Sequence, residues 1–101
     1  MLYCYAHERL APNLRDLIAV QEAAGRAAVE RGFVLGALIV EEDSSGTAMQ
    51  ALIDAVSSQP NGTAVAIPHR GHLIPLGRPY EWQLFLEEIT RHPLLFTGRT
   101  S

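Results

Sequence analysis

Short apolar segments alternate with longer amphipathic segments along this chain of 101 residues. The former have the length of buried strands, and the latter repeat their apolar residues at helical spacing. The expected strands are Leu2–Ala6, Phe33–Val40, Thr63–Ile67 and Leu94–Thr97, and the expected helices are Leu14–Arg31, Thr47–Ser58 and Tyr80–Arg91. Such alternation produces a parallel sheet with right-handed crossovers. We therefore expect a three-layer α/β sandwich around a mostly parallel four-stranded sheet, in the strand order second, first, third, fourth.

Two apolar patterns predict where the core lies. The run Phe33–Val40 is continuously apolar, which predicts a strand buried on both faces. In the last helix, Trp82, Phe85, Leu86 and Ile89 recur at helical spacing and are expected to form a core-facing stripe. The segment between His69 and Gly77 carries two glycines and a proline and is expected to be a loop.

Composition limits the class of protein. Hydrophobic residues make up 48% of the chain, which fits a single globular domain over residues 1–97 with a short tail at 98–101. The formal net charge is −3, and lysine is absent. Because proteins that grip nucleic acid by its phosphates normally carry a basic face, a nucleic-acid partner is not expected.

Cysteine content and apolar runs indicate where in the cell the protein is expected. The single cysteine, Cys4, lies in an apolar run and is expected to be a buried small residue, with no disulfide within the chain. The N-terminus lacks the pattern of a signal peptide, and no apolar run approaches the length of a membrane span. We expect a cytoplasmic protein without a membrane partner.

Polar residues follow each of the first three strands. Because the carboxyl ends of parallel strands meet at one edge of a sheet, where open α/β sheets bind ligands, these residues form a candidate ligand or anion site. The candidates are His7, Arg9, Asp43, Ser45, Gly46, His69 and Arg70. The simpler alternative is that strand ends meet water and carry polar residues for that reason alone.

Three strings near these positions follow a recognisable order. Residues 5–9 read Tyr-Ala-His-Glu-Arg, residues 40–46 read Val-Glu-Glu-Asp-Ser-Ser-Gly, and residues 69–73 read His-Arg-Gly-His-Leu. Over Leu2–Leu73 the chain resembles the catalytic domain of serine recombinases, the resolvases and invertases. That family has Tyr-x-Arg-x-Ser, an acidic loop with Ser-Gly, and Asp-Arg-x-x-Arg at these places. The stretch Leu76–Thr97 is similar to the tail of small actinobacterial orphan proteins of this type, which brings no function with it.

The departures from the family pattern bear on activity. Arg9 stands where the family has its nucleophilic serine, and arginine offers no nucleophilic oxygen. His7 replaces the first arginine, His69 the aspartate and Leu73 the last arginine. Phosphoryl transfer depends on positioning and on such cations, so the resemblance implies an inactive domain.

Other chemistry at this edge stays open as alternatives. Residues 44–47 read Ser-Ser-Gly-Thr at a helix start, which suits either an anion site or an ordinary cap. Ser44 or Ser45 with His7 or His69 as base would rebuild a hydrolase. No spacing typical of a metal site occurs, and we expect no metal and no cofactor.

We therefore expect a catalytically inactive recombinase-like domain that acts as a protein-binding or regulatory module. The alternatives are a small-molecule or anion-binding protein or enzyme using the carboxyl-edge cluster, and a DNA-associated accessory factor. The family's dimerisation helix would lie beyond Ser101, so a protein partner or weak homodimer is expected on the last helix or on an unpaired sheet edge. Leu84 is expected to be exposed there, whereas Phe85→Glu is expected to unfold the chain.

Overall fold

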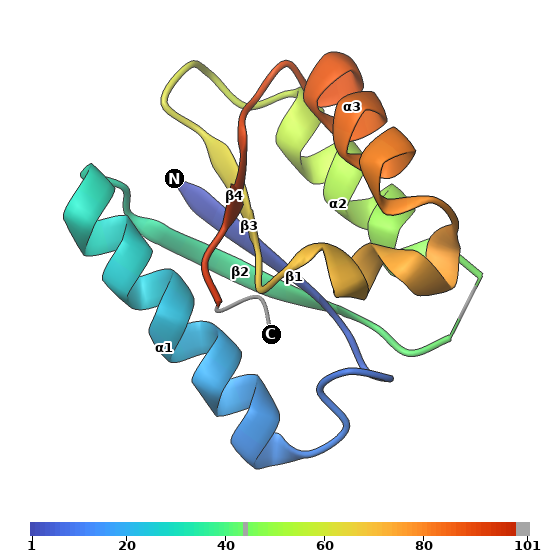
Figure 1. Ribbon diagram of the computed structural model, residues 1–101. Coiled ribbons are helices and arrows are strands. Elements are labelled where there is room, and N and C mark those ends of the chain that lie inside the picture. The colour runs from blue at the N-terminus through green and yellow to red at the C-terminus, as the bar shows by residue number, and fades with distance from the viewer. Residues whose placement is uncertain (44, 99–101) are drawn as a thin grey trace.

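The computed structural model describes residues 1–43 and 45–98 (Figure 1). These residues form four strands, α-helices on either side of them, and one 3-10 helix. The strands are β1 (Leu2–His7), β2 (Leu35–Glu41), β3 (Ala64–Ile67) and β4 (Leu94–Phe96). The helices are α1 (Leu14–Arg31), α2 (Thr47–Ser57), η1 (Arg70–Leu76) and α3 (Pro79–Thr90), of which η1 is the 3-10 helix. Of the expected tail, only Gly98 belongs to the described residues.

The sheet has the order β2-β1-β3-β4, and every pair is parallel. Strand β1 lies in the middle, with Tyr5 beside Ile39 of β2 and Tyr3 beside Val65 of β3. This order and the α/β class confirm the predicted fold. Because all strands run the same way, the ends of β1, β2 and β3 meet at one edge of the sheet.

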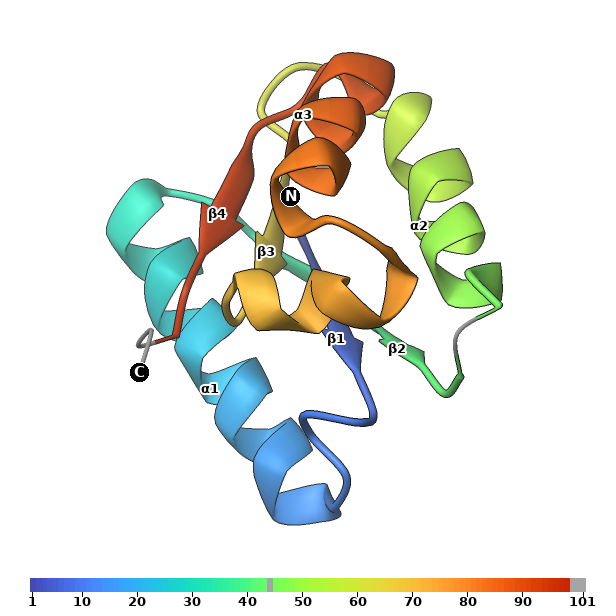
Figure 2. The same cartoon turned by 45° about the vertical axis from the view of Figure 1, so that its right-hand side comes forward.

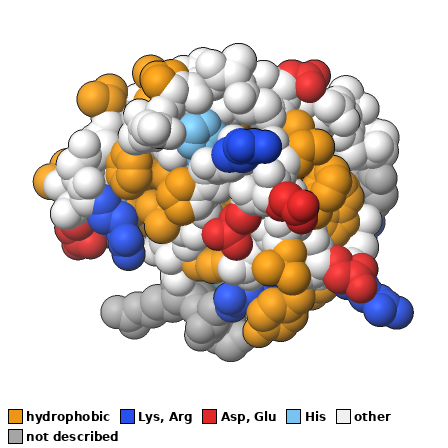
Figure 3. All heavy atoms as spheres, turned by 90° about the horizontal axis from the view of Figure 1, so that it is seen from above, with side chains coloured by type: hydrophobic (Ala, Val, Ile, Leu, Met, Phe, Trp, Pro, Cys, Tyr) orange, Lys and Arg blue, Asp and Glu red, His pale blue; other side chains and the backbone are white. Residues whose placement is uncertain are grey.

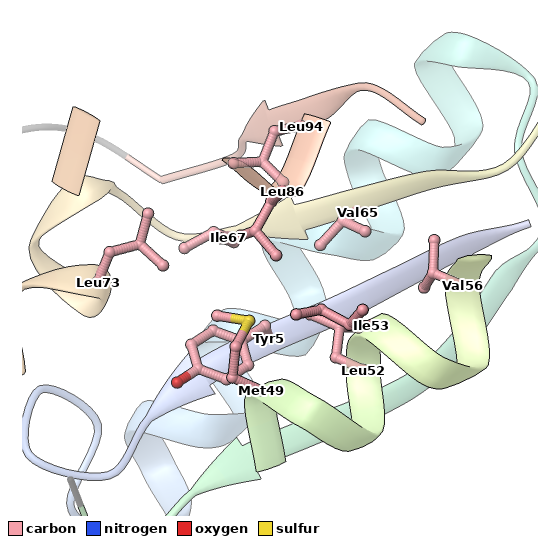
Figure 4. Packing of buried hydrophobic residues seen from close by; sticks show 10 residues of the cluster. All are labelled: Tyr5, Met49, Leu52, Ile53, Val56, Val65, Ile67, Leu73, Leu86 and Leu94. Carbon is pink, nitrogen blue, oxygen red and sulfur yellow. The ribbon is translucent and has the colours of Figure 1, made fainter. Parts of the chain in front are cut away.

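The two faces of the sheet are covered differently. Helix α1 lies on one face, and α2 and α3 lie on the other (Figures 1 and 2). The face below α2 and α3 buries large side chains, which Figure 4 shows packed together. The face below α1 buries mostly small ones, including Ala24 and Ala28 of the helix itself. The thicker core therefore lies between the sheet and α2 and α3.

The boundaries of α1 follow from local chemistry. The side chain of Asn13 accepts a hydrogen bond from the Asp16 N–H at 2.9 Å, which caps the first turn. Gly32 ends the helix at φ 75°, a left-handed conformation that glycine adopts without a steric penalty. Both residues can be read from the sequence, and the predicted range matches the observed one.

Strand β2 corrects one expectation. It was predicted to be buried on both faces, but it lies at the edge of the sheet, and Leu35 and Ala37 are exposed. Within β2, only Glu41 is fully buried. An apolar run predicts a strand, yet its position in the sheet depends on the other strands.

The expected loop after His69 is also more regular than predicted, since most of it forms η1. His69 caps this segment by accepting a hydrogen bond from the Gly71 N–H at 3.0 Å. Pro75 lies inside the 3-10 helix. Separately, no helix among the residues described is both long enough and apolar enough to cross a membrane.

Helix α3 is rotated relative to the predicted core stripe. Leu86 is fully buried and Trp82 is half-buried, but Phe85 and Ile89 are each 46% exposed. The prediction that Phe85 belongs to the core is therefore wrong. Leu84 is 67% exposed, as expected. The helix thus keeps a half-open apolar flank.

Candidate functional site at the carboxyl edge of the sheet

The ends of the central strands bring several predicted residues together. His7 is buried at the end of β1, and its backbone N–H donates to Nδ1 of His72 at 3.0 Å. Its Nε2 lies 2.9 Å from the carbonyl oxygen of Asp43, after β2. The edge therefore joins β1, β2 and η1 through the imidazoles of His7 and His72.

The hydrogen bonds assign the same tautomer to three imidazoles. Nδ1 of His7 accepts from the Arg9 N–H at 3.1 Å, while Nδ1 of His72 and His69 accept from the N–H groups of His7 and Gly71. Each neutral ring therefore carries its proton on Nε2. The rings of His69 and His72 meet edge to face, with their centroids 4.8 Å apart.

His72 is held in its neutral form. Its burial lowers its pKa from 6.5 to about 4, and the nearby charges that His69 and His7 carry when protonated add to this effect. At neutral pH the buried ring is uncharged. It acts as an acceptor that fixes the end of β1.

Glu41 is the central residue of the edge, although it is not among the residues that the sequence predicts for the site. Although charged residues are rarely fully buried, its side chain is only 2% exposed. One carboxylate oxygen, Oε2, accepts the Ala48 N–H at 3.0 Å, and Oε1 accepts the Met49 N–H at 3.1 Å. Oε1 also accepts the hydroxyl of Tyr5 at 3.3 Å. Burial raises the pKa of Tyr5, and the adjacent carboxylate raises it further.

The remaining groups at the start of α2 are bonded to one another. Asp43 accepts the Ser45 N–H at 2.8 Å, and hydrogen bonds from Ser45 lower the pKa of the Asp43 carboxyl. The Ser45 hydroxyl lies 2.8 Å from the Thr47 hydroxyl and accepts the Thr47 N–H at 3.2 Å. Gly46 precedes the helix at φ 80°.

These bonds occupy the N–H groups that a bound anion would use. A free helix start attracts anions because its first N–H groups lack partners. Here Ser45 accepts from Thr47, and Glu41 accepts from Ala48 and Met49. An anion at this position would have to displace the Glu41 carboxylate.

The two arginines predicted for the site lie apart from these bonds. Arg9 is exposed after β1. Arg70 is directed toward α3, where its Nε donates to Gln83 at 3.0 Å. Its guanidinium carbon also lies 4.8 Å from the centre of the Tyr80 ring and 4.5 Å from that of Phe96. Arg70 thus ties η1 to α3 and β4 by hydrogen bonding and cation–π contact.

The proposed alternatives can be compared with this geometry. Ser44 lies outside the described residues. Ser45 bonds to Thr47, and within the described part of the chain no hydrogen bond joins a serine hydroxyl to a histidine. Residues 1–43 and 45–98 also contain no group of three or more His, Cys, Asp or Glu side chains placed to hold a metal ion.

Comparison with known proteins adds no identification at this point. The chain matches no family model, no curated protein and no solved structure.

Proposed function

We propose that this chain is a catalytically inactive recombinase-like domain that acts as a protein-binding module through the exposed flank of α3. The motif order supports the likeness to serine recombinases, and Arg9 in place of the serine supports the lack of activity. The observation that carries the proposal is the contrast between a carboxyl edge bonded to itself and an apolar helix flank open to solvent.

The carboxyl edge supports the first half of this contrast. At this edge, backbone N–H groups of the chain donate hydrogen bonds to the side chains of His7, His72 and Glu41. A catalytic group has to contact a substrate, so acceptors used in this way serve the fold instead. These hydrogen bonds therefore stabilise the ends of β1 and β2 within the fold.

The α3 surface supports the second half. Around Phe85, one hollow of about 410 Å³ is lined by Leu76, Trp82 and residues near them, and a second of about 470 Å³ by Ile89 and its neighbours. The rings of Trp82 and Phe85 meet edge to face at 5.6 Å. Figure 3 views the end of the molecule that holds the C-terminal end of α3, where apolar side chains lie among charged ones. Aromatic side chains of this kind are common anchors in protein interfaces.

The test is capture of a partner by matched variants. Tagged wild-type protein, Leu84→Glu and Phe85→Glu would be compared with Gln50→Glu, a change at an exposed position of α2. Retained proteins are quantified by mass spectrometry, and the best candidate is purified and titrated against each variant. We expect both α3 variants to weaken binding at least about tenfold, as loss of an anchor does, and Gln50→Glu to match the wild type.

Two results would contradict the proposal. One is a purified partner that binds both α3 variants as tightly as the wild type. The other is turnover of a DNA phosphodiester by the wild-type chain, which would make the domain an enzyme.

A further inference from the structure

A single histidine side chain bonds η1 to the end of β1. The backbone N–H of His7 donates to Nδ1 of His72 at 3.0 Å, and both residues are at most 2% exposed. Among the described residues, this is the only hydrogen bond between a side chain of η1 and β1. Leu73 adds apolar packing beneath the same segment. On its other side, η1 is bonded to α3 through Arg70.

The bond to His72 requires a neutral imidazole. Nδ1 accepts a hydrogen bond only while it carries no proton, because the protonated ring is a donor at both nitrogens. A proton on Nδ1 would point at the N–H of His7. A buried charge without a partner is also strongly unfavourable. Protonation of His72 is therefore compatible with this fold only when the ring leaves its place beside β1.

The cations around His72 oppose its protonation in place. His7 on β1 and His69 before η1 add positive charge when they are protonated, and each already accepts a backbone N–H through its own Nδ1. Arg70 of η1 is a further cation, and the α3 residues that contact it are the neutral Gln83 and Tyr80. Neither β1 nor α3 thus brings a counter-charge to the ring.

The acids at the end of β2 are bonded elsewhere. The Glu41 carboxylate accepts hydrogen bonds from Tyr5, Ala48 and Met49, and the Asp43 carboxylate accepts one from Ser45. Glu8, Arg9 and Glu42, which follow β1 and β2, are exposed. Within residues 1–43 and 45–98, the one ion pair joins Arg78 to Glu81, so no histidine is paired with a carboxylate there.

Segment η1 also forms part of the hollow on α3. Leu76 and Gly77, at its C-terminal end, line the hollow of about 410 Å³ together with Trp82 and Phe85. The Gly77 N–H donates to the carbonyl oxygen of Ile74 at 3.1 Å and closes the end of η1. A Cβ atom at Gly77 would lie 2.9 Å from Nε1 of Trp82. The end of η1 therefore lies directly against the Trp82 ring, and a displacement of η1 changes the hollow.

From the His7–His72 bond, the lack of a counter-charge and the place of η1 beside Trp82, we infer that His72 is a pH switch: its protonation releases η1 from β1 and opens the wall of the α3 hollow. The consequence for a partner rests on the function proposed above. A protein bound at the α3 flank is held more tightly at neutral pH than in acid. The switch itself operates without a partner.

The size of the effect follows from the two states of His72. Burial lowers its pKa to about 4 in the closed state, whereas a released histidine titrates near 6.5. Between these values the open state binds more protons, so a fall in pH favours opening. From pH 7.5 to 5.0 the ratio of open to closed chains should rise roughly 30-fold.

Amide hydrogen exchange followed by NMR tests the switch at these two pH values, with rates corrected for the intrinsic effect of pH on exchange. In the wild type, the protection of the His7 and Gly77 N–H groups should both fall roughly 30-fold. His72→Asn offers an amide oxygen to the His7 N–H but takes up no proton, so both protections should stay nearly constant. The matched control is His92→Gln, at a buried histidine that bonds to Gln59 instead. It should keep the wild-type fall.

Urea distinguishes a local opening from unfolding of the whole chain. Global unfolding exposes far more surface, so about 1 M urea accelerates exchange that requires it and leaves local exchange nearly unchanged. We expect urea to accelerate exchange at Ile53, a buried residue of α2, and not at His7 or Gly77.

Three results would overturn the inference. The first is equal protection of the His7 N–H at both pH values in the wild type. The second is a Gly77 N–H that stays protected while that of His7 opens, and the third is the same urea dependence at His7 and Ile53. Because no partner is present, a failure of the switch is distinguished from a failure of the α3 binding surface, which the capture by Leu84→Glu and Phe85→Glu reports.

Discussion

Glu41 determines much of what the carboxyl edge can bind. Its carboxylate accepts the N–H groups of Ala48 and Met49 and the hydroxyl of Tyr5, and these bonds offset the cost of burying a charge. An internal anion thus fills the place where a phosphate would otherwise meet the start of α2. The sequence shows Glu41 only as part of an acidic run, because burial depends on how β2 meets α2.

The first prediction concerns this carboxylate. Glu41→Gln keeps the shape of the side chain but turns one oxygen into a donor that faces a backbone N–H. We expect a loss of about 2 kcal/mol in the free energy of unfolding, measured by urea denaturation. Glu42→Gln, at the exposed neighbouring position, should change it by less than about 0.5 kcal/mol. Equal effects of the two changes would show that Glu41 does not cap α2.

The second prediction concerns the protonation of His72. Its folded-state pKa is lowered to about 4, whereas an unfolded histidine titrates near 6.5, so between these values the unfolded chain binds more protons. Stability should therefore fall as the pH drops from 6.5 to 4, by up to roughly 3 kcal/mol. In His72→Asn, urea denaturation across this window should show a shallower dependence on pH. An unchanged slope would mean that His72 does not contribute to it.

Among the elements, α3 differs most from expectation. Its apolar positions predict a helix, yet they do not fix which side faces the sheet. Leu86 and Thr90 turn inward, and Arg70 contacts Tyr80 on one side of the helix. Phe85 and Ile89 consequently remain on a half-open flank.

The third prediction compares adjacent residues of α3. Phe85→Glu should cost less than about 1 kcal/mol, because its side chain is half exposed and can reach water. Leu86→Ala should cost about 2–4 kcal/mol, since it leaves a cavity in the core. Thermal unfolding followed by circular dichroism would measure the loss of stability in each variant and distinguish the two. A larger loss for Phe85→Glu would restore the prediction that this residue is buried.

The sequence predicts elements better than the contacts between them. Asn13 and Gly32 are local signals, so the limits of α1 follow from the chain alone. The edge position of β2, the orientation of α3 and the direction of Arg70 depend on residues far apart in the sequence. Of the candidate site, the meeting of His7 with Asp43 follows from parallel strands, whereas the burial of Glu41 and the contact of His7 with His72 do not.

For the whole molecule, the proposal of a recombinase-like scaffold used for binding rests on the order of the three motifs in the sequence. The parallel sheet places the carboxyl ends of β1, β2 and β3 together at one edge, where open α/β sheets bind ligands. At that edge, hydrogen bonds to Glu41 and between His7 and His72 join segments of the chain to one another. More than half of the large apolar side chains that are exposed among the described residues lie instead on α1 and α3.

The most direct test of this account is a search for a covalent link between the chain and DNA. Purified wild-type protein and Arg9→Ser are each incubated with recombination-site DNA and run on a denaturing gel beside an active serine recombinase. We predict no adduct for either, because Arg9 offers no nucleophile, and Arg9→Ser still lacks the arginines that His7 and Leu73 replace and the aspartate that His69 replaces. An adduct with the wild-type chain would contradict the account outright, and an adduct with Arg9→Ser alone would show that the edge keeps a working phosphoryl-transfer site.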